Sequence, residues 1–326
     1  MTKFFSAMGR ILTAAVLLAI AGFTAAQQSY PNKPIRFISP FPPGGGTTIV
    51  ARLIGQKLTE SWGQQVLVDN RPGGNTIIGS EALVRSAPDG YTIMIQASTH
   101  ATNPNLLALP YDSIKDFAPV ATVSSNEYML VVNPSIPANN LQEFIALAKS
   151  KPGQLNFAST GTGSPQHLAG ELFNIMTGVK MQHIPYKGSG QILPDLIGNQ
   201  VQLAFMNPLN AVPHVKAGQL KAIAISGDAR VPALPQVPTF TEAGLTGFDV
   251  RNWYGVFAPA ATPKQIIDKL ANEIARIMAL PDIRDKLASQ GAEPFVTTPE
   301  QFAALIKADI AKFGKIIKTA NIRLDK

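Results

Sequence analysis

Residues 35–58 read IRFISPFPPGGGTTIVARLIGQKL, and this stretch carries the clearest indication of the fold. It begins with a short apolar run, Ile35–Ser39, whose β-branched and aromatic residues predict a strand. It ends with apolar residues at helical spacing, namely Ile49, Val50, Leu53, Ile54 and Leu58. Between the two lies the loop Pro40–Thr48, which holds three consecutive glycines. A strand that leads through a glycine-rich loop into a helix is typical of α/β proteins.

The same alternation continues along most of the chain. The strands that we expect are Ile35–Ser39, Gln65–Asn70, Tyr91–Gln96, Tyr128–Val132, Leu155–Ala158, Met181–Ile184, Gln202–Met206, Leu220–Ser226 and Trp253–Ala258. Further apolar stripes that predict helices are Leu168, Ala169, Leu172, Phe173 and Met176, and then Leu270, Ile274, Ile277 and Met278. This order predicts an α/β fold whose parallel sheets carry helices on both faces.

The length points to two domains, because a domain takes roughly 100–200 residues. We expect the first from residues 27–126 plus 250–326 and the second, with a proline-rich connector, from residues 127–249. The end of the chain, Thr262–Lys318, reads as helices with one apolar interruption at Pro294–Val296. We expect this tail to pack back across the first domain. The pairs Thr262-Pro263 and Thr298-Pro299 each predict an N-cap followed by a first-turn proline.

Residues 1–26 have the features of a signal peptide. Lys3 and Arg10 make the start positive, and the apolar run Ile11–Phe23 follows. The small residues Thr24-Ala25-Ala26 then predict cleavage after Ala26. A retained membrane anchor is the alternative, although the run is short for a bilayer span. The segment therefore predicts export across the inner membrane.

Charge and composition argue against several kinds of protein. Cleavage removes Lys3 and Arg10 and no acid, so the formal charge falls from +7 to +5 (7 − 2 = 5). The basic residues are not clustered, which argues against nucleic-acid binding, and a mild positive field favours small anions. The chain contains no cysteine, so it has no thiolate metal site, cysteine nucleophile or redox pair.

Sequence signatures of catalysis are also missing. There is no GxSxG or HExxH, and the histidines are far apart in the sequence, at His100, His167, His183 and His214. Ser164 and His167 are three residues apart, but helix capping explains that spacing. A pair of carboxylates that meet only in space stays open. We therefore expect a binding protein without metal or cofactor instead of an enzyme.

Two loops carry the strongest binding prediction, because each leads from a strand into a helix N-terminus whose unpaired N–H groups suit an anion. The first loop contributes Pro43, Gly44, Gly45, Gly46, Thr47 and Thr48. The second contributes Ser159, Thr160, Gly161, Thr162, Gly163, Ser164 and His167, with Ser164 as N-cap and Pro165 behind it. Two such helix starts, one in each domain, predict a clamp on one small carboxylate. For the first loop alone, an ordinary strand–helix turn is the alternative.

Further candidates follow other strands, where open α/β sheets place their ligands. Ser98, Thr99 and His100 come after one expected strand and Asn207 after another. Trp253 lies where we expect the chain to cross between the domains. Each has an alternative: His100 as a hydrogen-bonded histidine in a turn, and Trp253 as packing at the hinge.

The chain resembles the Bug-type receptors, the periplasmic solute-binding components of tripartite tricarboxylate transporters. The resemblance runs from about Tyr30 to Leu324 and rests on phrases that occur in order: YPNKPIRFISPFPPGGGT (Tyr30–Thr47), NRPGGN (Asn70–Asn75), APDGYT (Ala87–Thr92), LPYDSIKDFAPV (Leu109–Val120), HLAGELF (His167–Phe173), PYKGSG (Pro185–Gly190), PHVKAGQLKAIA (Pro213–Ala224) and LPQVPTFTEAG (Leu234–Gly244). It implies a two-domain Venus-flytrap binding protein, type II-like, with the ligand in the interdomain cleft. It also implies a periplasmic location and integral membrane permease subunits as partners. We expect a monomer.

The chain departs from the pattern of these receptors at two positions. The usual GGGTD reads GGGTT, with Thr48 in place of an acid, and the usual FDN reads FMN, with Met206 in place of another. Losing an acid that meets an amino group, or repels a second carboxylate, favours a ligand without an ammonium group. We therefore expect a dicarboxylate or an aromatic carboxylate instead of an amino acid. A periplasmic sensor for a signalling system, or an enzyme on the same scaffold, remain the alternative functions.

Overall fold

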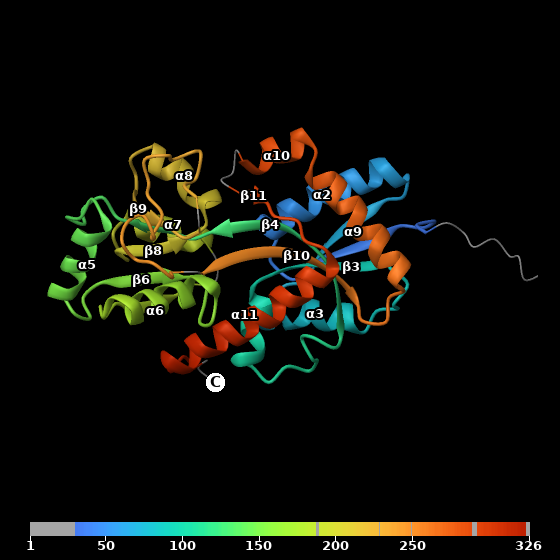
Figure 1. Cartoon of the computed structure of the whole chain (residues 1–326), viewed down its shortest axis with the longest axis horizontal. Helices are drawn as coiled ribbons and strands as arrows, with labels where there is room; N and C mark the ends of the chain where they lie inside the picture. The colour runs from blue at the N-terminus through green and yellow to red at the C-terminus, as the bar shows by residue number, and fades with distance from the viewer. Residues whose placement is uncertain (1–29, 187–188, 228, 249, 289–291, 324–326) are drawn as a thin grey trace, which may run out of the picture.

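The computed structural model describes residues 30–186, 189–227, 229–248, 250–288 and 292–323, and within these it forms two α/β units side by side (Figure 1). The signal peptide predicted over residues 1–26 lies outside the described residues. No helix in the described ranges has both the length and the apolar character needed to cross a membrane.

The sheet of the first unit takes strands from both ends of the chain. Its strands are β1 (Ile35–Ser39), β2 (Val66–Asn70), β3 (Thr92–Ala97), β4 (Phe117–Glu127), β10 (Arg251–Pro259) and β11 (Glu293–Pro294). They lie in the order β11-β4-β10-β3-β1-β2. β1 is parallel to β2 and β3, whereas β10 is antiparallel to both β3 and β4. The prediction of purely parallel sheets is therefore wrong here.

The sheet of the second unit comes from one continuous segment. Its strands are β5 (Met129–Val132), β6 (Asn156–Ser159), β7 (Gln182–Pro185), β8 (Leu203–Met206) and β9 (Lys221–Ile225). Their order is β7-β6-β8-β5-β9. β6 is parallel to β7 and β8, and β5 is antiparallel to β8 and β9, so this sheet is mixed as well.

Helices cover both faces of both sheets, as the sequence predicts. The helices of the first unit are α2 (Gly46–Trp62), α3 (Ile77–Val84), α4 (Thr99–Thr102), α9 (Lys264–Met278), α10 (Pro281–Ala288) and α11 (Pro299–Thr319), with 3-10 turns η1 (Gly74–Thr76) and η2 (Asn103–Asn105). Those of the second unit are α5 (Leu141–Ser150), α6 (Pro165–Thr177), α7 (Ser189–Ile197) and α8 (Pro208–Lys216).

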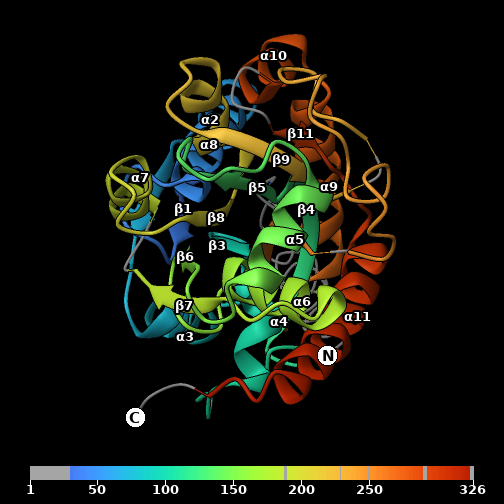
Figure 2. The same cartoon turned by 90° about the vertical axis from the view of Figure 1, so that its left-hand side faces the viewer.

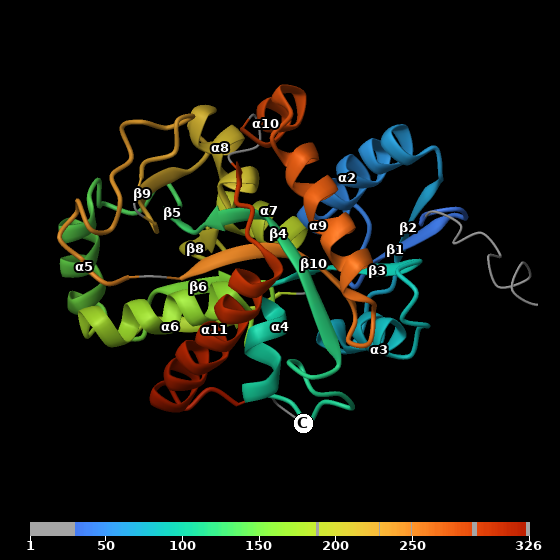
Figure 3. The same cartoon turned by 45° about the vertical axis from the view of Figure 1, so that its right-hand side comes forward.

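The long helix α11 joins the two units on one side. It packs against β4 and α4 of the first unit and also reaches α6 of the second (Figure 3). One apolar cluster follows it through both units and includes Phe302 and Phe313 from α11 and Phe157 and Phe173 from the second unit. The expectation that the helical tail packs back across the first domain is confirmed.

The strands expected from the sequence are all present, with ends within two residues of the prediction. One strand was not predicted, namely β4, which has 11 residues and is longer than any of the expected strands. Pro119 and the polar residues at the end of this strand do not give the pattern expected of a strand. The proline is tolerated because it lies at an irregularity in the pairing with β10, where Phe257 is opposite.

Two of the three predicted helix starts are confirmed. Thr298 closes a capping box with Gln301, and the Ser164 side chain accepts a hydrogen bond from the backbone N–H of His167. The third start is wrong by one residue, because α9 begins at Lys264 with Pro263 as its N-cap. The buried Thr262 hydroxyl has no hydrogen-bond partner among the described residues.

The chain crosses between the units at Tyr128 and at Val250, and one serine links the two crossings. The Tyr128 backbone N–H donates to Ser226 Oγ (2.8 Å). The Ser226 hydroxyl has two acceptors within reach, the Val250 carbonyl oxygen (3.0 Å) and Glu127 Oε2 (2.9 Å). Both crossings lie at the carboxyl ends of the parallel strands. In the first sheet, Glu127 ends β4, which runs in the direction of β1 and β3, and pairs with Arg251 at the start of β10. In the second sheet, Met129 at the start of β5 pairs with Met206, which ends β8. The domain limits at residues 126/127 and 249/250 stay predictions.

Candidate ligand-binding site

The first predicted loop ends in a helix start without a side-chain cap. Gly45 is the N-cap of α2, and because it has no side chain it makes no capping hydrogen bond to the first turn. The first hydrogen bond of the helix runs from the N–H of Ile49 to the carbonyl of Gly45 (3.1 Å). The N–H groups of Gly46, Thr47 and Thr48 thus have no acceptor within the helix, which leaves them available to an anion.

Asn70, at the end of β2, fixes this loop. Its side-chain N–H donates to the Phe41 carbonyl (2.9 Å) and to Thr48 Oγ1 (2.8 Å). Ser39 Oγ lies 3.4 Å from Thr48 Oγ1. Thr48 is only 1% exposed, and its neutral hydroxyl supports the loop from the buried side. Both strand ends therefore support the same helix start.

Tyr254 of β10 approaches the same helix start. A Cβ added to Gly46 would lie 2.5 Å from its Oη, so only glycine leaves room for the ring. Burial raises the pKa of Tyr254 to about 12, which keeps the phenol neutral and able to donate.

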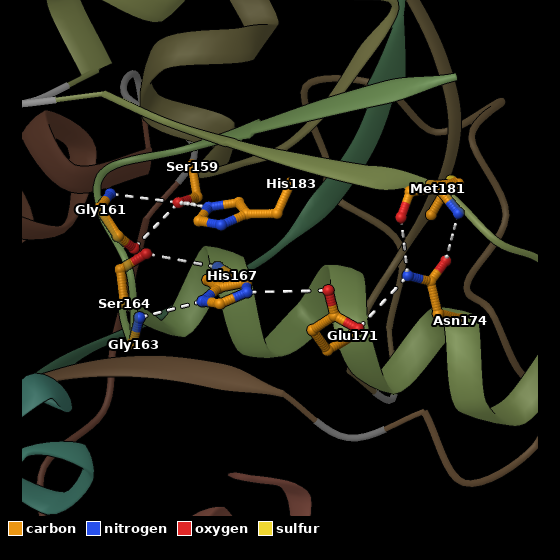
Figure 4. Close-up of polar contacts among 9 residues, drawn as sticks. All are labelled: Ser159, Gly161, Gly163, Ser164, His167, Glu171, Asn174, Met181 and His183. Atoms are coloured by element: carbon orange, nitrogen blue, oxygen red, sulfur yellow. Dashed lines mark hydrogen bonds and ion pairs between the residues drawn. The ribbon is translucent and has the colours of Figure 1, made fainter. Parts of the chain in front are cut away.

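The second predicted loop is held mainly by its own hydrogen bonds (Figure 4). The Ser159 hydroxyl donates to the Gly161 carbonyl (2.9 Å), and Thr160 Oγ1 donates to Gln166 Oε1 (2.8 Å). These two hydroxyls, predicted to meet a carboxylate, are thus engaged within the loop region. The Thr162 hydroxyl has no hydrogen-bond partner among the described residues and is partly exposed, so it is available.

The sheet topology brings the two loops to facing edges. The first loop follows the carboxyl end of β1 and the second follows that of β6, and the crossings at Tyr128 and Val250 lie at these same ends of the two sheets. Figure 2 shows the second unit in front of the first. Direct contact supports this: a Cβ on Gly163 would collide with the Leu106 side chain of the first unit. The helix start in each unit therefore faces the other unit.

The remaining predicted residues have different surroundings. Ser98 and Thr99 are buried beside β3, and Ser98 Oγ donates to Asn252 Oδ1 (2.8 Å). Asn207 is buried directly after β8, next to the start of α8. These placements are at carboxyl strand ends, as expected, but their binding roles stay predictions.

For His100 and Trp253 the structure favours the alternative interpretation. His100 is 2% exposed, its ring packs against Phe117 and Phe257, and its Nε2 donates to the Ser113 carbonyl (2.8 Å). Trp253 is also 2% exposed, and its indole N–H donates to Asp309 Oδ2 (2.8 Å). Both side chains are thus enclosed by the core, and their contacts with a ligand stay predictions.

Burial of His100 makes stability depend on pH. Burial lowers the pKa of His100 from 6.5 to about 4. Between these two pH values His100 is therefore protonated in the unfolded chain and neutral in the folded chain. The free energy of unfolding should fall as pH drops from 6.5 to 4, by at most about 1.4 kcal/mol per pH unit for this group. His183, with a pKa lowered to about 3 by burial and then by His167, acts in the same direction.

Urea unfolding at several pH values checks this for the wild type and His100→Gln, which keeps a donor for the Ser113 carbonyl. We expect a shallower loss of stability with acid in the variant. An equally steep loss in both proteins would contradict the assignment to His100.

No group of three or more histidine, aspartate or glutamate side chains within the described part of the chain is arranged to bind a metal ion. The polar groups gathered at the two loops are backbone N–H groups, hydroxyls and a carboxamide, which suit an oxyanion.

The two units and their facing helix starts define the class of the protein, a two-domain periplasmic binding protein. The structure of R. palustris Rpa4515 with adipate superposes with a TM-score of 0.83 at 33% identity, over 90% of this chain and 99% of that one. MatC (Rpa3494) from Rhodopseudomonas palustris with bound malate has a TM-score of 0.78 at 33% identity, over 88% of this chain and 100% of that one.

The family follows from the sequence comparisons. The model of the tripartite tricarboxylate transporter family receptor matches residues 50–322. BugT of Bordetella pertussis is 36% identical over 314 residues, 95% of this chain and 96% of that protein. The chain belongs to this family of solute-binding receptors, which confirms the resemblance to Bug-type receptors.

Proposed function

We propose that this chain is a periplasmic receptor that captures a small organic carboxylate and delivers it to the permease of a tripartite tricarboxylate transporter. The observation that carries the proposal is the pair of helix starts, at Gly46 and Pro165, on the facing edges of the two sheets. The first start leaves the N–H groups of Gly46, Thr47 and Thr48 without an acceptor in the helix. At the second start Pro165 has no N–H and that of His167 donates to Ser164 Oγ, so the first turn offers the N–H of Gln166 alone. The family membership supports transport.

The ligand class follows from what surrounds the first loop and the end of β8. Thr48 is a buried neutral residue, and Met206 is 4% exposed within an apolar cluster that includes Met129 and Ile225. Neither position offers a carboxylate to an ammonium group. A dicarboxylate or aromatic carboxylate is therefore favoured over an amino acid, in line with adipate and malate in two related structures.

Capture works through movement of the two units about Tyr128 and Val250. A ligand shifts the equilibrium between open and closed forms only by its difference in affinity for them. Because each loop belongs to a different unit, a carboxylate that touches both binds the closed form more tightly. The receptor acts as a monomer after cleavage near Ala26 and returns its ligand chemically unchanged.

Binding measurements on a protein that begins at Gln27 test the proposal. We expect calorimetry to show tight binding of a non-amino carboxylate, from a panel of adipate, malate, other dicarboxylates and benzoates, and weak or no binding of aspartate and glutamate. Mass spectrometry of small molecules that copurify from the periplasm widens the panel. Tight binding of amino acids alone would contradict the ligand class, and a converted ligand would contradict the receptor function.

A further inference from the structure

Two stacked histidine rings lie beside the second loop (Figure 4). His167 comes from the first turns of α6 and His183 from β7, and their ring centroids are 3.6 Å apart with an angle of 9° between the planes. His167 is 5% exposed and Phe157 of β6 lies beside both rings. The pair is therefore a built feature of the loop support, and the proposed function does not use it.

Each ring holds one end of the loop. The Gly163 N–H donates to His167 Nδ1 (3.0 Å), so this nitrogen carries no proton. His183 Nε2 lies 2.6 Å from Ser159 Oγ, whose single hydrogen is donated to the Gly161 carbonyl. His183 Nε2 is therefore the donor. Loop shape thus depends on one imidazole acceptor and one imidazole donor.

A proton added to this arrangement disrupts it. Protonated His167 presents an N–H at Nδ1 to the N–H of Gly163, and the hydrogen bond is lost. The two rings cannot both carry a positive charge without strong repulsion, because their centroids are only 3.6 Å apart. Burial and then His167 lower the pKa of His183 to about 3, so His183 stays neutral between pH 8 and pH 5. Within the described residues, the charged group in contact is Glu171, whose Oε1 lies 3.7 Å from His167 Nε2.

We propose that the His167–His183 pair is a proton-sensitive support of the second loop, which holds the carboxylate at neutral pH and releases it when His167 takes up a proton. This inference rests on the proposed function for the ligand, but the loop transition itself occurs without ligand. Both histidines are positioning residues, because they act through the backbone of the loop.

The first experiment follows the Gly163 backbone amide of the ligand-free protein by NMR between pH 8 and pH 5. We expect a large shift of its resonance on acidification in the wild type. His167→Asn keeps an acceptor at the place of Nδ1 but does not titrate, so its Gly163 resonance should stay constant. A constant resonance in the wild type, or the same shift in the variant, would overturn the proposal.

The second experiment measures adipate and malate affinity at pH 7.5 and 5.5. We expect acidification to weaken binding to the wild type by a factor at least about ten times larger than for the double variant His167→Asn/His183→Gln. One proton can change the affinity by up to tenfold per pH unit. Protonation of the ligand affects both proteins equally. Equal losses would overturn the proposal. If the amide shifts but no carboxylate binds at either pH, the proposed function fails and the loop transition stands.

His167→Leu separates support from titration. It removes the acceptor for the Gly163 N–H, and we expect weak binding at both pH values in a protein that still unfolds cooperatively. Wild-type affinity in this variant would show that the hydrogen bond does not shape the site.

Discussion

Replacing Thr48 with aspartate is expected to weaken dicarboxylate binding by roughly 100- to 1,000-fold. A carboxylate at this position lies beside the N–H groups of the first loop, where Thr48 is 1% exposed and neutral. Two like charges about 4 to 6 Å apart repel by about 3 to 4 kcal/mol near a protein surface. Asn70, which donates to Thr48 Oγ1 at 2.8 Å, keeps the new carboxylate ionised.

Thr48→Asn is the matched control, because it has the size and the hydrogen-bonding groups of aspartate without the charge. Calorimetry should show near wild-type affinity for the asparagine variant, and thermal unfolding checks that both variants are folded. An aspartate variant that binds as tightly as the asparagine variant would remove Thr48 from the site. Improved binding of an amino acid by the aspartate variant would support its role in ligand preference.

Gly163→Ala is the second change with a large expected effect, because it crowds a contact between the two units. Gly163 has φ +78, and an added Cβ collides with the Leu106 side chain of the other unit. The backbone strain costs about 1 to 2 kcal/mol. The collision adds to this only when the units are together, so affinity should fall at least about tenfold.

Gly178→Ala is the control for backbone strain. Gly178 ends the same helix with φ +71, and an added Cβ there meets nothing within 4 Å. It should therefore lose stability but keep its affinity. Combining Gly163→Ala with Leu106→Ala should restore part of the binding, because the smaller side chain leaves room. Identical affinities in the two glycine variants would show that the contact between Gly163 and Leu106 does not matter for capture.

The strand–loop–helix units were predictable because their signals are local. Apolar runs such as Ile35–Ser39 are bounded by proline and glycine, and each strand appeared within two residues of its expected limits. Strand direction was not predictable. β10 runs antiparallel to β3 and β4, because the chain leaves and re-enters the first unit at the same edge. The residue pattern within a single strand does not indicate its direction relative to its neighbours.

The site was predictable to the same extent. Both loops were found because glycines before a helix leave a pattern in the sequence. The residues that shape them were not found: Asn70 and His183 act on loops 22 and 24 residues away, and Tyr254 comes from the other end of the chain. The burial of His100 could not be predicted either, because a polar residue directly after a strand gives the same pattern whether a ligand or the core surrounds it.

The position of β10 between β4 and β3 also sets the order in which the two units can be completed. Until Pro259 has arrived, the sheet of the first unit consists of two separate pieces, whereas every strand of the second unit is present at Ile225. Because synthesis proceeds from the N-terminus, every strand of the second unit is available before the first unit can close its sheet. The unit that begins earlier in the sequence is therefore the one whose sheet is completed later.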